Sequence, residues 1–145
     1  MVKRAEAKGA GELRAALRAA GLRATPSRVA VLGLLSSASA PVSHGDAAAA
    51  LEGGGWDRAT LYRNLLDLTR AGLARRDDLG DHVWRFELAR GHDVTLHPHF
   101  VCDECGEVSC LDGAVVVMPR GAAAPRALRT GGVEVHVKGR CDGCA

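Results

Sequence analysis

The sequence predicts an α+β protein, because two patterns divide the chain. Apolar residues at helical spacing fill most of the first 76 residues, and a short alternating segment follows them. The remainder, residues 77–145, holds all five cysteines and five of the six histidines, and its short apolar runs predict strands. With 145 residues, the chain has the length of one domain or of two small ones.

Composition excludes several classes of protein. With 47% hydrophobic and 25% charged residues, the chain can bury a core, and with 3% aromatic residues that core must consist of Leu, Val and Ala. No apolar run approaches the ~18 residues needed to cross a bilayer. The first residues lack the apolar segment of a secretion signal. We therefore expect a cytoplasmic protein.

Helix start and stop signals divide the first half into short helices. Gly21 is a typical stop after the first apolar pattern. Thr25 and Pro26 are typical of a helix start, the first as a cap and the second at the first helical position. The expected helices cover residues 12–20, 26–37, 47–51 and 58–71, with a glycine loop at 53–55.

The helix over residues 58–71 is the most informative one. Asp57 is its predicted cap, and three leucines at helical spacing form its buried stripe. Arg63 and Arg70 fall on the opposite side. The buried leucines are Leu61, Leu65 and Leu68.

A hairpin is predicted after this helix, with arms at residues 73–76 and 82–88. Trp84, Phe86 and Leu88 share one face of the second arm. Short helices followed by a hairpin are the order of a winged helix-turn-helix, in which the helix before the hairpin enters the major groove of DNA. A small helical domain with a charged, solvated face is the alternative.

Charge is distributed unevenly. Residues 1–76 carry 12 Lys and Arg against 6 Asp and Glu, whereas residues 77–145 carry 7 against 11. A basic half suits a polyanion, and an acidic half rich in Cys and His suits a metal ion. Chance scatter of charge is the alternative that composition leaves open.

Two CxxC pairs predict a structural zinc site. Cys102 and Cys105 form the first pair, Cys141 and Cys144 the second, and 35 residues separate them. Four thiolates suit the closed tetrahedral coordination of structural zinc. A dithiol redox site and two disulfides are the competing interpretations, and a cytosolic setting favours neither. The intervening segment predicts a strand at 115–118, a weak helix at 122–128 and a strand at 133–138.

A second metal site is predicted beside the first pair. His97 and His99 are two residues apart, so in an extended segment both imidazoles face the same side. Glu87 at the hairpin end could complete the set. Two half-exposed strand histidines are the alternative. The sequence leaves open whether three further histidines bind metal: His82, His92 and His136.

Several motifs, in order, resemble the ferric uptake regulator (Fur) family. Residues 22–28 (LRATPSR) resemble its LRxTxxR opening, and residues 57–63 (DRATLYR) its recognition helix. Residues 71–73 (AGL) are similar to the close of that helix. The metal-binding motifs follow: residues 97–106 (HPHFVCDECG) are similar to HxHxxCxxCG, and residues 139–144 (GRCDGC) to GxCxxC. The resemblance covers nearly the whole chain.

The resemblance implies a metal-responsive transcriptional repressor that controls iron or zinc uptake genes. It implies a winged-helix DNA-binding domain at residues 1–88 and an α/β dimerisation and metal-sensing domain at 89–145. The implied partners are an A/T-rich palindromic operator in double-stranded DNA and a second copy of the chain. No enzymatic activity, membrane or small-molecule substrate is implied.

The resemblance also implies roles for single residues. The four paired cysteines fall on structural zinc positions. The regulatory ligands, for Zn²⁺ or Fe²⁺, fall on His44, Glu87, His97 and His99, with Cys110 as a fifth candidate. The expected DNA contacts are Arg23, Arg58, Thr60, Tyr62 and Arg63.

The chain departs from the family pattern at three places. Cys110 stands where relatives place a carboxylate, and a thiolate shifts metal preference towards zinc. Gly132 and Val133 stand where relatives have a strand histidine. Pro119, Gly121 and Pro125 interrupt the segment that forms the family's dimerisation helix.

The sequence leaves two rival functions open. Glu87, His97 and His99 could hold a catalytic zinc with an open position, as in a hydrolase. Against a hydrolase, no nucleophile or separate general base is evident. Alternatively, Cys110 could act as a thiol redox switch in a regulator, or lie buried as a small apolar residue.

Overall fold

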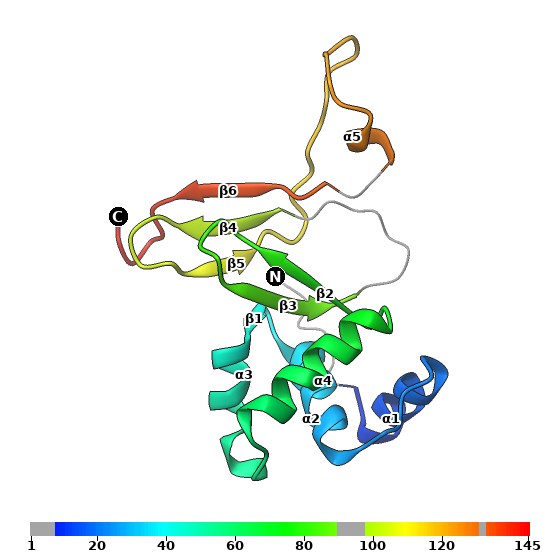
Figure 1. Ribbon diagram of the computed structural model, residues 1–145. Helices are drawn as coiled ribbons and strands as arrows, with labels where there is room; N and C mark the ends of the chain where they lie inside the picture. Colours follow the sequence, from blue (N-terminus) through cyan, green and yellow to red (C-terminus); the bar gives the residue numbers. More distant parts are fainter. Residues whose placement is uncertain (1–7, 90–97, 131–132) are drawn as a thin grey trace. The chain divides into compact units, whose positions relative to one another are not determined.

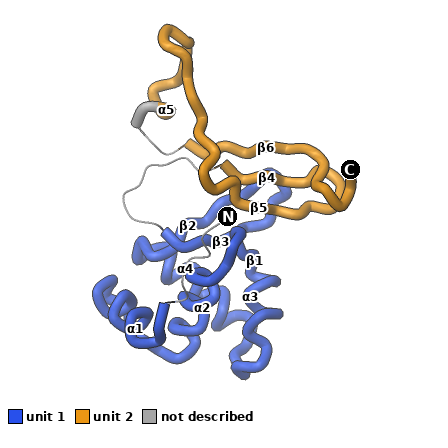
Figure 2. Tube along the Cα trace, turned by 180° about the vertical axis from the view of Figure 1, so that it is seen from behind, with its two compact units in different colours: residues 1–89 blue, residues 90–145 orange. Residues whose placement is uncertain are grey.

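The computed structural model describes residues 8–89, 98–130 and 133–145. Helices and strands both occur, as Figure 1 shows, so the fold is α+β. The chain forms two compact units, residues 1–89 (unit 1) and residues 90–145 (unit 2), coloured blue and orange in Figure 2. None of the helices in the described ranges has the length and apolar content needed to span a bilayer.

Unit 1 begins with helices whose ends follow the predicted capping signals. The Thr25 side chain accepts a hydrogen bond from the Arg28 amide, and the Asp57 side chain accepts one of 2.6 Å from the Thr60 amide. Gly21 has a φ of 77°, the left-handed conformation that glycine adopts most readily. The helices are α1 (Ala10–Ala19), α2 (Pro26–Ser37), α3 (His44–Ala50), the 3-10 turn η1 (Glu52–Gly54) and α4 (Arg58–Arg70).

A three-stranded antiparallel sheet completes unit 1. Its strands are β1 (Val42–Ser43), β2 (Ala74–Asp78) and β3 (Trp84–Leu88), in the order β1-β3-β2. Helix α4 packs against α2 and β2, so the leucine stripe of α4 lies in the core. Leu61, Leu65 and Leu68 are at most 1% exposed, which confirms the predicted stripe.

The structure differs from prediction at several places in unit 1. Strand β1 was not expected, and α3 begins at His44 rather than at residue 47, because Ser43 caps it. The expected glycine loop contains the short 3-10 turn η1. Trp84, expected to share the buried face of Phe86, is 44% exposed, whereas Phe86 is fully buried. Trp84 begins β3 at the turn end of the hairpin, and the Arg76 guanidinium lies 4.0 Å from the centre of its ring.

Unit 2 contains a second small sheet. Strand β4 (His99–Cys102) is central, antiparallel to β5 (Val108–Cys110) and parallel to β6 (His136–Gly139). Because β4 and β6 are parallel, their C-terminal ends lie side by side at one end of the sheet. The two CxxC pairs begin at these strand ends and are therefore brought together. A four-residue helix, α5 (Ala127–Thr130), precedes β6.

Three predictions for unit 2 were wrong in extent. Residues 115–118 form no strand, and their four side chains are between 41% and 79% exposed. The helix expected over 122–128 is reduced to α5, and the last strand begins only at His136. Pro119 and Pro125 lack the amide that a helix or ladder needs, and Gly121 has a φ of 82°.

Candidate metal centres and nucleic-acid interface

Four thiols converge in unit 2. Cys102 ends β4, Cys105 lies in the turn after it, and the second pair follows β6. The Asp103 amide donates to the Gly139 carbonyl, 2.9 Å away, which ties the first turn to the end of β6. As a result, the Sγ atoms of all four cysteines lie within 4.8 Å of one another: Cys102, Cys105, Cys141 and Cys144.

The spacing of the thiols matches zinc better than a disulfide. Cys105 Sγ and Cys141 Sγ are 3.6 Å apart, and all five cysteines are free thiols. A disulfide needs about 2.05 Å between its sulfurs. Two thiolates on a tetrahedral zinc at Zn–S distances of about 2.3 Å lie about 3.8 Å apart.

Backbone amides stabilise one of these cysteines as a thiolate. The amides of Cys105 and Cys141 lower the pKa of Cys102 to about 6. The Cys141 amide donates to Cys102 Sγ over 3.4 Å. A thiolate is the form that binds metal, so the turn prepares Cys102 for coordination.

The thiols of the second pair, Cys141 and Cys144, ionise less easily, because their pKa values are raised. The neighbouring Cys105 thiol, followed by burial, raises the pKa of Cys141 to about 12. The pKa of Cys144 is also raised. Four negative charges this close repel one another, and a divalent cation removes that repulsion. The donor set therefore fits structural zinc.

Two of the predicted regulatory ligands face each other in unit 2. His99 on β4 pairs directly with Cys110 on β5, and their donor atoms lie within 4.8 Å. His99 is 2% exposed and Cys110 is partly buried. His97 lies outside the described residues, as does His92.

The other two predicted ligands, Glu87 and His44, belong to unit 1. Glu87 lies on β3, where an oxygen of its carboxylate is 3.3 Å from the Arg75 guanidinium. His44 begins α3, and its Nε2 donates a 2.8 Å hydrogen bond to the Arg58 carbonyl. The His44 ring also lies 5.1 Å from the Tyr62 ring. In the neutral ring this arrangement leaves the lone pair of Nδ1 as the one for a metal.

Of the predicted DNA contacts on α4, Arg63 lies opposite the leucine stripe, whereas Tyr62 lies on its flank and packs against the core. Arg58 and Arg63 are exposed, and Tyr62 and Thr60 are partly buried. The Arg63 guanidinium donates to the Thr60 hydroxyl over 3.4 Å. The Thr60 amide lowers the pKa of Asp57, so the cap stays charged at the helix N-terminus.

Polar contacts that sequence reasoning missed hold α4 against α2. The Asn64 amide donates to the Ser27 hydroxyl at 2.9 Å in the core, and Arg28 pairs with Asp67 at 2.7 Å. Asn64 and Asp67 are three residues apart on α4. Their spacing on the edge of the leucine stripe is the signal that could have found them.

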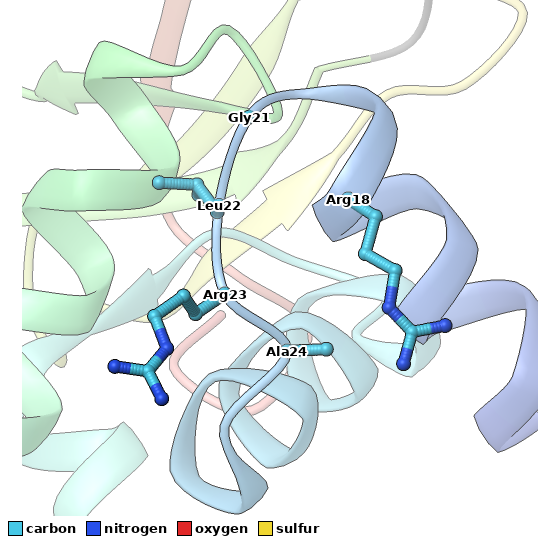
Figure 3. Close-up of a pocket in the computed structure, with 5 residues that line it drawn as sticks. All are labelled: Arg18, Gly21, Leu22, Arg23 and Ala24. Atoms are coloured by element: carbon cyan, nitrogen blue, oxygen red, sulfur yellow. The ribbon is translucent and has the colours of Figure 1, made fainter.

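Arg23 lies in the loop between α1 and α2, beside a second arginine that sequence reasoning also missed. Arg18 and Arg23 line an open hollow of about 460 Å³. Figure 3 shows their guanidinium groups on either side of Ala24. The Arg28 guanidinium donates to the Arg23 carbonyl over 3.2 Å. Two cations at an open surface suit an anion such as a phosphate.

Known proteins with similar sequences belong to the family that the motifs resemble. The Ferric uptake regulator family profile matches residues 19–116. The chain is 38% identical to ferric uptake regulation protein 1 of Mycolicibacterium fortuitum over 109 residues, which are 74% of this chain and 66% of that protein. It is 34% identical to the peroxide operon regulator of Bacillus subtilis over 94 residues, 63% of this chain and 62% of that protein. The matched region thus spans less than two thirds of these relatives.

Solved structures show the same fold. The ferric uptake regulator of Pseudomonas aeruginosa with manganese superposes with a TM-score of 0.60 at 29% identity, covering 89% of this chain and 97% of that one. The family profile matches more than half of the chain. The chain therefore belongs to the ferric uptake regulator family.

Proposed function

We propose that the chain is a metal-responsive transcriptional repressor of the cytoplasm that binds operator DNA as a homodimer and controls iron or zinc uptake genes. The observation that carries the proposal is the position of His44. This candidate metal ligand donates to the Arg58 carbonyl and packs beside Tyr62, both on α4. If His44 binds a metal ion and its ring moves, its contacts with Arg58 and Tyr62 change, and so does the position of the helix that carries the candidate DNA contacts.

Helix α4 would enter the major groove, with Thr60, Tyr62 and Arg63 towards the base edges. Arg58, together with Arg18 and Arg23 at the hollow, would contact phosphates and make affinity fall with salt. In a dimer, two such helices would meet an A/T-rich palindrome about 34 Å apart. The exposed run at residues 115–118 is an apolar surface that a second copy would cover.

Two kinds of metal site support this function. The paired cysteines would hold a structural zinc, for which their spacing and charge are suited. His44, Glu87, His97, His99 and Cys110 would hold the regulatory ion. Because Cys110 supplies a thiolate, zinc is favoured and ferrous iron comes second.

The regulatory ion would act by shifting a population. Its ligands come from both units, so it binds the arrangement that gathers them better than any other. Moving a mostly open protein to a mostly closed one needs about 5.5 kcal/mol of such difference. Several ligands from each unit are enough to supply it.

The rival functions have less support. A hydrolase with Glu87, His97 and His99 is not favoured, because the family whose profile matches the chain consists of regulators. Redox sensing through Cys110 predicts loss of DNA binding with oxidant, which the same assay detects.

The test is DNA binding with each metal in turn. A labelled A/T-rich palindrome is titrated with the zinc-loaded dimer in the presence of added Zn²⁺, Fe²⁺ or Mn²⁺. We expect metal-dependent binding, with Arg63→Ala abolishing it and leaving metal affinity unchanged. Arg120→Ala is the matched control, because Arg120 is exposed in unit 2 and the charge change is the same. Equal binding by wild type and Arg63→Ala would remove α4 from the groove.

A further inference from the structure

Three metal-binding side chains stand in one row across the sheet of unit 2. His99 on the central strand β4 pairs with Cys110 on β5 and, on its other side, with His136 on β6. Figure 1 shows these three strands lying side by side. Directly paired residues project to the same face of a sheet, and neighbouring strands are about 4.8 Å apart. The row therefore places two imidazoles and a thiol on one face.

The next row projects to the other face, and the two rows differ in exposure. Val137, which pairs with Phe100, is 42% exposed, whereas His99 is 2% exposed. The histidine row thus lies on the better protected face of β4. Protection from water strengthens the attraction between a cation and its ligands.

A carboxylate lies beside the row. Glu134 Oε2 is 3.4 Å from His136 Nε2. This Nε2 is buried and makes no hydrogen bond with the residues that the structure describes. A buried polar nitrogen without a hydrogen bond is costly and calls for an explanation.

The distance itself suggests one. Two ligand atoms, each about 2.0–2.1 Å from a tetrahedral zinc, lie about 3.4 Å apart. His136 and Glu134 have this spacing. His99 and Cys110 form a second pair on the adjoining strands. The two pairs lie on neighbouring strands, and their four donor atoms do not form one cluster within 4.8 Å, so the side chains must change rotamer to bind a common ion.

We propose that His136 binds metal together with His99 and Cys110, and that Glu134 supplies the fourth donor. The set of two nitrogens, one sulfur and one oxygen suits a thiophilic divalent cation, zinc above all. Unit 2 then holds the ion with its own residues, and a ligand from unit 1 joins it by replacing the Glu134 carboxylate. The inference rests on the proposed function in taking His99 and Cys110 as ligands.

The experiment uses the 145-residue chain with one zinc per chain in the four-cysteine site. Co²⁺ is added as the probe, because thiolate–Co²⁺ coordination gives a charge-transfer band and tetrahedral Co²⁺ gives intense visible absorption. Zinc affinity of the second site is then measured by chelator competition. The variants are His136→Ala, His136→Gln, Glu134→Gln and Cys110→Ser, and the control is His82→Ala, whose side chain is 96% exposed in unit 1.

We expect both His136 variants to weaken the second site about tenfold or more, and Glu134→Gln to weaken it less. The thiolate band should survive in them and disappear in Cys110→Ser, while His82→Ala behaves as wild type. His136→Gln keeps a polar side chain of similar size, so its zinc content and thermal melting separate ligand loss from misfolding.

Wild-type affinity and visible spectrum in a folded His136→Gln protein would overturn the inference while leaving Cys110 as a ligand. If Cys110→Ser instead keeps the band and the affinity, the regulatory ligand set of the proposed function fails. The two failures are therefore distinguishable in one series.

Discussion

The two units of the chain are stabilised by different means. Unit 1 buries leucines from three helices together with Phe86 of its sheet, and it holds the apolar core. In the described part of unit 2, the buried residues are Pro98, His99 and Cys102, while four consecutive apolar side chains at 115–118 are exposed. Burial of apolar surface stabilises the first unit. On the proposed function, bound metal and the surface of a second copy stabilise the second unit in place of an apolar core.

This contrast predicts that loss of a zinc ligand unfolds one unit and spares the other. Cys141→Ser should release the structural zinc and unfold unit 2, because the binding free energy of a structural zinc, about 10–16 kcal/mol in small zinc domains, is folding free energy. Both tryptophans, Trp56 and Trp84, lie in unit 1, so tryptophan fluorescence should still report a folded unit.

Zinc content and circular dichroism measure the loss in unit 2. Cys110→Ser is the control, because Cys110 lies outside the four-thiol cluster and should keep one zinc per chain. A Cys141→Ser protein with full zinc content and unchanged melting would mean that unit 2 has another source of stability.

The next largest effect concerns the core of unit 1. Leu65→Ala should destabilise unit 1 by about 2–5 kcal/mol, because it leaves a cavity at a side chain that is 0% exposed. Arg70→Ala, at a side chain that is 75% exposed on the same helix, should change stability by less than about 0.5 kcal/mol. Urea unfolding followed by tryptophan fluorescence measures both variants. An equal cost at the two positions would show that Leu65 does not pack in the core.

The same contrast explains how far the sequence predicts the structure. In unit 1, caps such as Thr25 and Asp57 and the leucine stripe of α4 are local signals, and the helices form where these signals stand. In unit 2, pairing between distant strands decides the fold, and no local pattern specifies that β4 lies between β5 and β6. The apolar composition of residues 115–118 predicts a strand, but these residues have no partner strand in the part of the chain that the structure describes.

The residues of the candidate sites also differ in whether a local or a long-range pattern specifies them. Spacing alone predicts the four thiols, because each CxxC pair is local and zinc needs four ligands. His136 is left open by the sequence, since only its pairing with His99 places it in the row. Ser27 and Asn64 were missed because their hydrogen bond joins two helices 37 residues apart.

The smallest expected effect is an electrostatic one at the hairpin turn of unit 1. Hydrogen bonds from the Arg85 guanidinium, at 2.7 and 2.9 Å, lower the pKa of Asp81 from 3.8 to about 2. A folded-state pKa below the unfolded one stabilises the protein above pH 3.8, and this contribution is lost as the pH falls towards 2. The Asp81 side chain is 42% exposed, so solvent screening reduces the contribution to below about 1 kcal/mol.

Asp81→Asn should therefore lower the free energy of unfolding by a few tenths of a kcal/mol near neutral pH. This deficit in stability against wild type should shrink between pH 4 and pH 2, as measured by urea unfolding with tryptophan fluorescence. Because the zinc thiolates lie in unit 2 and both tryptophans in unit 1, acid release of zinc does not obscure this signal. A deficit that stays constant down to pH 2 would show that Asp81 acts through packing rather than through its charge.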